Sequence, residues 1–213
     1  MRSISFPKTP STIKAIIYLN ISVYVLCMLA SWFKIDLFTL LGATPYLIIE
    51  KKYLWQPFTY LFVHANILHL FLNMLMLWFL GPELYKLWGR GFFIRYYLIC
   101  GIGAGMATLL LPIIDQRTYL IPTVGSSGAI FGLLLAYGVN FKNRLLYLFG
   151  LIPIKAGKLV LILAGIELIS MLSQNSGPIS HIAHLGGLIT GFIYIKTKDL
   201  ELFLIRKKYI KLN

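Results

Sequence analysis

Residues 125–139 read GSSGAIFGLLLAYGV, an almost wholly apolar stretch that opens on two serines. At 1.5 Å per residue, a helix from Ser127 to Val139 is about 20 Å long, whereas the hydrocarbon core of a bilayer is about 30 Å thick. The polar residues that follow at once are expected to lie at a membrane surface: Asn140, Lys142, Asn143 and Arg144. Ser127 would then lie roughly 10 Å below the opposite surface, a depth at which a polar helix start must be buried in protein or line a water-filled cavity.

Composition indicates a membrane protein throughout the chain. The 213 residues are 58% hydrophobic and 13% charged, whereas soluble domains are about 45–50% apolar and about 25% charged. Within the apolar runs of near-membrane length, only Lys14 and Glu167 carry a formal charge. We therefore expect an all-α polytopic membrane protein, with residues 1–213 forming a single domain of six transmembrane helices. The predicted spans are about 12–33, 61–80, 96–114, 125–139, 159–172 and 179–195.

The distribution of basic residues predicts the orientation of these spans. With six helices and a cytoplasmic N-terminus, the inner segments hold 16 of the 20 lysines and arginines. The outer segments hold Lys34, Lys51, Lys52 and Arg117. This split follows the positive-inside rule, so both termini are expected in the cytoplasm, with the basic C-terminal tail against anionic lipid. The net charge of +13 forms no basic stripe with interleaved aromatics, so nucleic acid is not an expected partner.

Two connecting segments and two cysteines complete the expected architecture. Residues 34–60 form a long outer loop whose aromatic residues suit the headgroup region. Leu145–Ile154 is apolar but too short to span, so we interpret it as an interfacial or re-entrant segment. Cys27 and Cys100 lie inside predicted spans without metal-ligand spacing, and we expect neither a metal nor another cofactor.

Polar side chains within the predicted spans are the candidate functional residues, because hydrocarbon is a costly environment for them. The set comprises His64, His69, Asn73, Ser126, Ser127, Glu167, His181 and His184. His69 and Asn73 are four residues apart and share one helical face. An alternative interpretation is that these groups only hydrogen-bond neighbouring helices. No role for Glu167 follows from the sequence.

A serine at a helix N-terminus is suited to nucleophilic chemistry. Free backbone N–H groups and the positive end of the helix dipole surround Ser127 and could stabilise an oxyanion. A serine hydroxyl also needs a base, and His184 lies near the outer end of the last span at a similar depth. Small residues on the two helices would permit a close approach: Gly128 and Gly132 on one, Gly187 and Gly191 on the other.

Together these residues resemble the rhomboid family of intramembrane serine proteases, over essentially the whole chain. The family's Gly-x-Ser-Gly motif is matched by Gly125-Ser126-Ser127-Gly128. Its pattern on the second helix is matched by His64, His69 and Asn73. Its pattern on the last helix is matched by Ala183-His184-Leu185-Gly186-Gly187 and by Gly191.

The resemblance implies a Ser127–His184 dyad without an acidic third member, Asp115 being a remote candidate for that role. It also implies an oxyanion hole formed by His69, Asn73 and the backbone N–H of Ser127. Phe131 stands where the family often has tyrosine, and would keep the ring that packs on the histidine. The supporting residues are then Gly125, Gly128, Phe131, Gly187 and Gly191. His64 and His181 are expected in structural and rim positions, and Gln56 stands where the family often has arginine.

The resemblance further implies the substrates and the setting. They would be single-span membrane proteins cleaved near the outer end of a transmembrane helix, with the loop of residues 173–180 covering the site. A bacterial inner membrane is the expected location. The alternatives are a non-catalytic member acting as a membrane chaperone or binding protein, and a small transporter. The residues do not indicate the oligomeric state.

Overall fold

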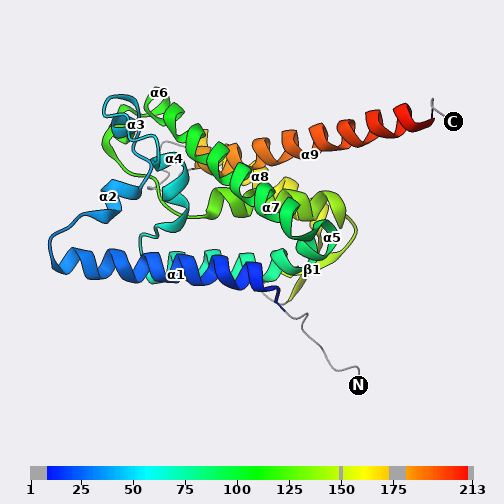
Figure 1. Ribbon diagram of the computed structural model, residues 1–213, viewed down its shortest axis with the longest axis horizontal. Coiled ribbons are helices and arrows are strands. Elements are labelled where there is room, and N and C mark those ends of the chain that lie inside the picture. The colour runs from blue at the N-terminus through cyan, green and yellow to red at the C-terminus, as the bar shows by residue number, and fades with distance from the viewer. Residues whose placement is uncertain (1–8, 149–150, 173–180, 211–213) are drawn as a thin grey trace, which may run out of the picture.

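Helices dominate the computed structural model, which describes residues 9–148, 151–172 and 181–210 (Figure 1). The longer ones are α1 (Ser11–Trp32), α5 (Ile67–Ala107), α7 (Ser127–Asn140), α8 (Ala156–Leu172) and α9 (His181–Ile210). By length and composition, two of the described helical segments could cross a membrane, Ser11–Trp32 and Ile67–Ile113. α1 also exposes many large apolar side chains, as a helix facing lipid would.

The predicted second and third spans form the two halves of α5. Gly89 interrupts the helix with φ 73° and ψ 171°, a conformation that glycine adopts without steric cost. The second half then returns to where the first began, since the Tyr60 hydroxyl donates a 2.6 Å hydrogen bond to the Gly101 carbonyl. The first half begins at Ile67, not at residue 61 as predicted, so His64 precedes the helix. Asn66 caps that helix by accepting from the His69 N–H.

The connection between α1 and α5 contains short helices rather than a simple loop. They are α2 (Leu37–Leu41), α3 (Pro45–Ile49), α4 (Gln56–Thr59) and the 3₁₀ turn η1 (Tyr60–Phe62). The buried Gln56 amide holds this region together: it accepts from the Thr44 N–H and donates to the carbonyls of Thr39 and Leu40. A neutral side chain therefore anchors the connection at the position where arginine is common in the family.

The segment predicted to be interfacial or re-entrant is a β-hairpin. β1 (Leu145–Leu148) pairs antiparallel with β2 (Ile152–Lys155), Leu145 lying opposite Lys155. Strand pairing provides hydrogen-bond partners for backbone N–H and C=O groups that a single extended segment would leave unpaired. The isoleucines on either side of the proline in β2 are β-branched residues, which favour strands. Between α5 and α7 lie the 3₁₀ turn η2 (Thr108–Leu110), α6 (Leu111–Ile114) and the 3₁₀ turn η3 (Gln116–Leu120).

α7 lies at the centre of the bundle and packs against α5, α8 and α9. Most of its side chains are buried, and Ala129, Leu133 and Ala136 are wholly inaccessible to solvent. The central position matters for function because it brings the start of α7 into contact with α5 on one side and α9 on the other. α9 continues well beyond the predicted end at residue 195. The segment after residue 195 is less apolar, but its leucine, lysine and glutamate residues have high helix propensity.

Candidate active site

The turn into α7 sets the position of Ser127. Gly125 has φ 112°, in the range that L side chains rarely adopt, and α7 begins two residues later. The Gly125 N–H donates to the Tyr60 carbonyl at 3.0 Å, which ties this turn to η1. A Cβ atom at Gly125 would lie 2.6 Å from Cε1 of His69, so glycine is also required for the imidazole to pack here.

Ser127 and His184 are brought into direct contact across α7 and α9. Oγ of Ser127 lies 2.8 Å from Nε2 of His184, whose side chain is largely buried. The two helices meet at Gly187, where a Cβ atom would collide with the backbone of Gly128. Backbone-to-backbone packing at this point is what allows a serine and a histidine from different helices to share a hydrogen bond.

The other predicted supporting residues divide between two neighbours. Phe131 stacks on the His184 imidazole, with ring centroids 4.3 Å apart and an interplanar angle of 13°. A Cβ atom at Gly132 would lie 2.5 Å from Sγ of Cys100 on α5 and 3.4 Å from the Gly187 carbonyl on α9, so this glycine lies where α7 packs against both helices. Gly191 on α9 also faces α5, because a Cβ atom there would lie 2.5 Å from the Tyr96 hydroxyl.

The predicted oxyanion residues lie at the start of α5. His69 packs against Gly125, just before Ser127 in the chain, and its ring meets that of His64 edge-on at 5.1 Å. The buried Asn73 donates one amide hydrogen to the His69 carbonyl at 2.8 Å, within its own helix. This bond leaves the second amide hydrogen for another acceptor. His69 is thus adjacent to the turn that leads into Ser127, whereas the hydrogen bond of Asn73 stays within α5.

Glu167 joins this group, which the sequence reasoning did not anticipate. Its Oε1 lies 3.0 Å from Nδ1 of His184, and its Oε2 lies 2.6 Å from Nδ1 of His181. The expectation that no acid lies near Ser127 and His184 is therefore wrong, and His181, which was predicted at the rim, is a partner of that acid. An ionisable residue within an apolar span was the available signal, but its partners lie on another helix.

Asp115 has a different role from the remote one considered for it. It is the N-cap of η3, where its carboxylate accepts from the Arg117 backbone N–H and pairs with the Arg117 guanidinium at 2.9 Å. Hydrogen bonds from the side chain and backbone of Arg117 hold the pKa of Asp115 below its ordinary value. The charge of Asp115 is therefore paired with Arg117.

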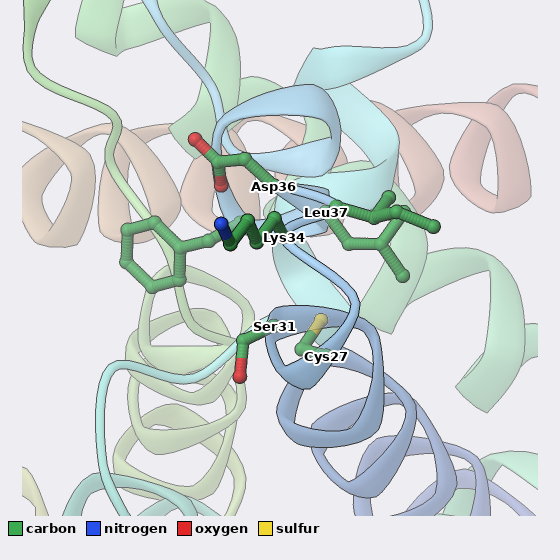
Figure 2. Close-up of a pocket in the computed structure, with 7 residues that line it drawn as sticks. Cys27, Ser31, Lys34, Asp36 and Leu37 are labelled. Atoms are coloured by element: carbon green, nitrogen blue, oxygen red, sulfur yellow. The ribbon is translucent and has the colours of Figure 1, made fainter.

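The described residues also include a cluster of potential metal ligands and a surface hollow. Glu167, His181 and His184 bring three potential metal-ligand atoms within 4.8 Å of one another, a donor set that zinc could use. A surface hollow at the C-terminal end of α1 is lined by Cys27, Ser31, Lys34, Asp36 and Leu37, among others (Figure 2). None of the predicted site residues lines this hollow.

Comparisons with known proteins identify the family. Residues 51–198 match the family model described as "Rhomboid domain". The chain is 29% identical over 153 residues to "Rhomboid protein 1, mitochondrial" of Saccharomyces cerevisiae, covering 70% of this chain and 44% of that protein. It is 33% identical over 153 residues to "Rhomboid protease GluP" of Bacillus subtilis, covering 71% of this chain and 27% of that protein.

A further relative from Bacillus subtilis, "Putative rhomboid protease YdcA", is 30% identical over 149 residues, covering 68% of this chain and 69% of that protein. The chain matches less than half the length of the yeast protein and of GluP. The matched domain contains all three motifs and the described contacts of Ser127, His184 and Glu167. The resemblance is confirmed: this chain is a membrane protein of the rhomboid family.

Proposed function

We propose that this chain is an intramembrane serine endopeptidase that cleaves transmembrane segments of single-span membrane proteins. The observation that carries this proposal is the 2.8 Å contact between Ser127 Oγ and His184 Nε2 at the largely buried start of α7. A hydroxyl next to an imidazole nitrogen is the minimal arrangement for general-base activation of serine. The relatives named as rhomboid proteases support the same assignment.

The geometry suggests how each group would act. Nε2 of His184 would accept the Ser127 proton as Oγ attacks the scissile carbonyl carbon. The imidazolium would then give that proton to the leaving amine, and a water molecule would hydrolyse the acyl-enzyme with the same base. The Ser127 backbone N–H, His69 and the second amide hydrogen of Asn73 would donate to the oxyanion. Stacked Phe131 would hold the imidazole plane during both transfers.

The substrate class follows from the setting of the nucleophile. An intact helix shields its peptide bonds, so a cleavable segment must unwind locally before Ser127 can reach a carbonyl.

We infer that the bundle has six spans, with α5 supplying two of them, and that both termini are cytoplasmic in a bacterial inner membrane. The nucleophile then lies toward the outer side. The predicted covering loop, residues 173–180, lies outside the described residues.

Substitution of the nucleophile tests the assignment. We expect Ser127→Ala to lower the cleavage rate of a model single-span substrate in detergent by at least about 10³-fold, as removal of a serine nucleophile does in other serine proteases. His184→Ala should cause a comparable loss. The measurement is the rate of product formation by purified protein, followed by gel electrophoresis.

The neighbouring serine provides a matched control. Ser126 is also buried, but within the described residues the hydroxyl that is hydrogen-bonded to His184 is that of Ser127, so Ser126→Ala should retain cleavage and fluorophosphonate labelling. Equal cleavage by wild type and Ser127→Ala would contradict the proposal. Binding of the substrate without cleavage, together with no labelling of Ser127, would instead indicate a non-catalytic membrane chaperone.

A further inference from the structure

A carboxylate and a second histidine extend the serine–histidine contact into a chain of four side chains. Ser127 lies 2.8 Å from His184, His184 lies 3.0 Å from Glu167, and Glu167 lies 2.6 Å from His181. The side chain of Glu167 is 12% exposed, that of His184 11% and that of His181 14%. Three helices contribute to this cluster: α7, α8 and α9.

The two ring nitrogens of His184 face opposite partners. Nε2 faces the Ser127 hydroxyl. For Nε2 to accept the hydroxyl proton, the single proton of the neutral imidazole must be on Nδ1. Nδ1 is buried and lies 3.0 Å from Oε1 of Glu167, although the pair lacks the alignment of a hydrogen bond. The distance matters more than the alignment here, because attraction between opposite charges depends on their separation. A carboxylate at this place favours the Nδ1–H tautomer and the imidazolium that forms during catalysis.

We propose that Glu167 is a positioning residue that completes a Ser127–His184–Glu167 triad, with His181 holding the second carboxylate oxygen. The inference rests on the proposed protease function and extends it beyond the expected dyad. Glu167 does not touch the substrate and takes no proton in the reaction. As Ser127 forms its bond to the carbonyl carbon, the proton moves to Nε2, and the positive charge on His184 is stabilised by the nearby carboxylate.

His181 explains how the carboxylate is held in place. Its Nδ1 lies one hydrogen-bond length, 2.6 Å, from Oε2, while Oε1 faces His184. His181 and His184 are three residues apart on the first turn of α9, so both rings face the same carboxylate from α8. The two contacts fix the two oxygens of Glu167 separately and thereby limit rotation of the carboxyl group.

A competing role for Glu167 would be a latch between α8 and α9 that controls substrate entry. The two roles differ in kinetics. A latch acts on substrate access, so its removal would lower KM or raise kcat. An orienting carboxylate acts on the imidazolium, so its removal lowers kcat and leaves KM nearly unchanged.

The experiment compares Glu167→Gln with wild type in detergent, with EDTA present throughout to remove any metal bound by the cluster. We expect kcat to fall between about 10-fold and about 10⁴-fold, the upper value being the cost of neutralising the acid in a Ser-His-Asp triad. Glu167→Asp, which keeps the charge, should recover part of the loss. Glu83→Gln is the matched control, because it also neutralises an ion-paired glutamate, one that pairs with Arg144 instead.

The pH profile separates electrostatic support from packing. The titratable groups around His184 are Glu167 on α8, His181 on α9 and His69 on α5. Because the carboxylate lies 3.0 Å from Nδ1 of His184, Glu167→Gln should change the pH dependence of kcat/KM, and Glu83→Gln should not. A substitution that only loosened the fold would lower kcat/KM without changing its pH dependence.

NMR spectroscopy tests the contact between Glu167 and His184 without a measurement of the cleavage rate. In protein labelled with ¹⁵N-histidine, the Nδ1 resonance of His184 should change on Glu167→Gln and not on Glu83→Gln. An unchanged resonance and unchanged kcat would overturn the triad, as would a rise in kcat or a loss of activity on adding EDTA to wild type. An inactive wild type with a Glu167-dependent resonance would refute the protease function while leaving the contact with His184 established.

Discussion

At the residue scale, Gly125 combines two constraints that can be separated by mutation. Its φ of 112° disfavours any L side chain, and a Cβ atom would also press on the His69 ring. We expect Gly125→Ala to destabilise the protein by about 1–3 kcal/mol through backbone strain. Displacement of His69 should additionally lower cleavage. Thermal unfolding in detergent and the cleavage rate are the two measurements.

Gly89 is the matched control for that prediction. It also has a positive φ, 73°, but a Cβ atom there would meet nothing within 4 Å. Gly89→Ala should therefore show the backbone strain alone, with a similar loss of thermal stability and near-normal kcat per folded molecule. Equal losses of kcat in both variants would mean that strain, and not the position of His69, explains the effect at Gly125.

Some residues of the candidate site could be predicted from the sequence, whereas some of their contacts could not. Ser127 and His184 could be singled out because each lies in a short motif, although the assignment of their roles stays a prediction. Phe131 was expected beside the histidine, and the two rings are stacked. Glu167 was noticed as an anomalous charge, yet its contacts depend on how α8 and α9 pack. Helical periodicity relates positions within one helix and not between two.

At the scale of elements, the packing of α7 against α9 determines whether Ser127 can contact His184. A Cβ atom at Gly187 would collide with the Gly128 backbone, which cannot move aside as a flexible side chain can. Gly187→Ala should push the helices apart and cost about 1–3 kcal/mol, typical of overpacking. A displacement of 1 Å between Ser127 and His184 would lower the cleavage rate by about 10²-fold.

Gly165 on α8 provides the comparison. A Cβ atom there would meet nothing within 4 Å, so Gly165→Ala should leave cleavage intact and stabilise the helix by up to about 1 kcal/mol. Fluorophosphonate labelling of Ser127 and thermal unfolding would be measured for both variants. Normal labelling of Gly187→Ala would show that close helix approach is not needed for the serine–histidine contact.

The elements themselves were predictable to different degrees. Long apolar runs reveal helices, so α1, α7 and α8 lie near their predicted positions. The two halves of α5 extend into residues 81–95 on either side of Gly89, and this extension was missed, because hydropathy locates the part of a helix suited to lipid and not its ends. The hairpin of β1 and β2 was also missed: a ten-residue apolar run does not distinguish a strand pair from an interfacial segment.

At the scale of the whole molecule, the basic residues follow the positive-inside rule only if six spans and a cytoplasmic N-terminus are assumed. The inferred arrangement places η3 and the β-hairpin on opposite sides of the membrane, because they flank the two ends of α7. Gln116 in η3 and Asn143 before β1 are both exposed and suit labelling. The split of 16 to 4 basic residues predicts that Asn143 is cytoplasmic and Gln116 external.

Single-cysteine variants test this orientation. In a background with Cys27→Ser and Cys100→Ala, Gln116→Cys should react with a membrane-impermeant maleimide in intact spheroplasts, and Asn143→Cys should react only after lysis. Both variants should label equally in detergent, which controls for exposure of the thiol. The reverse pattern would place Ser127 toward the cytoplasm and the basic tail outside. Labelling of both sites in intact spheroplasts would rule out an odd number of spans between residues 116 and 143, and with it a membrane-spanning α7.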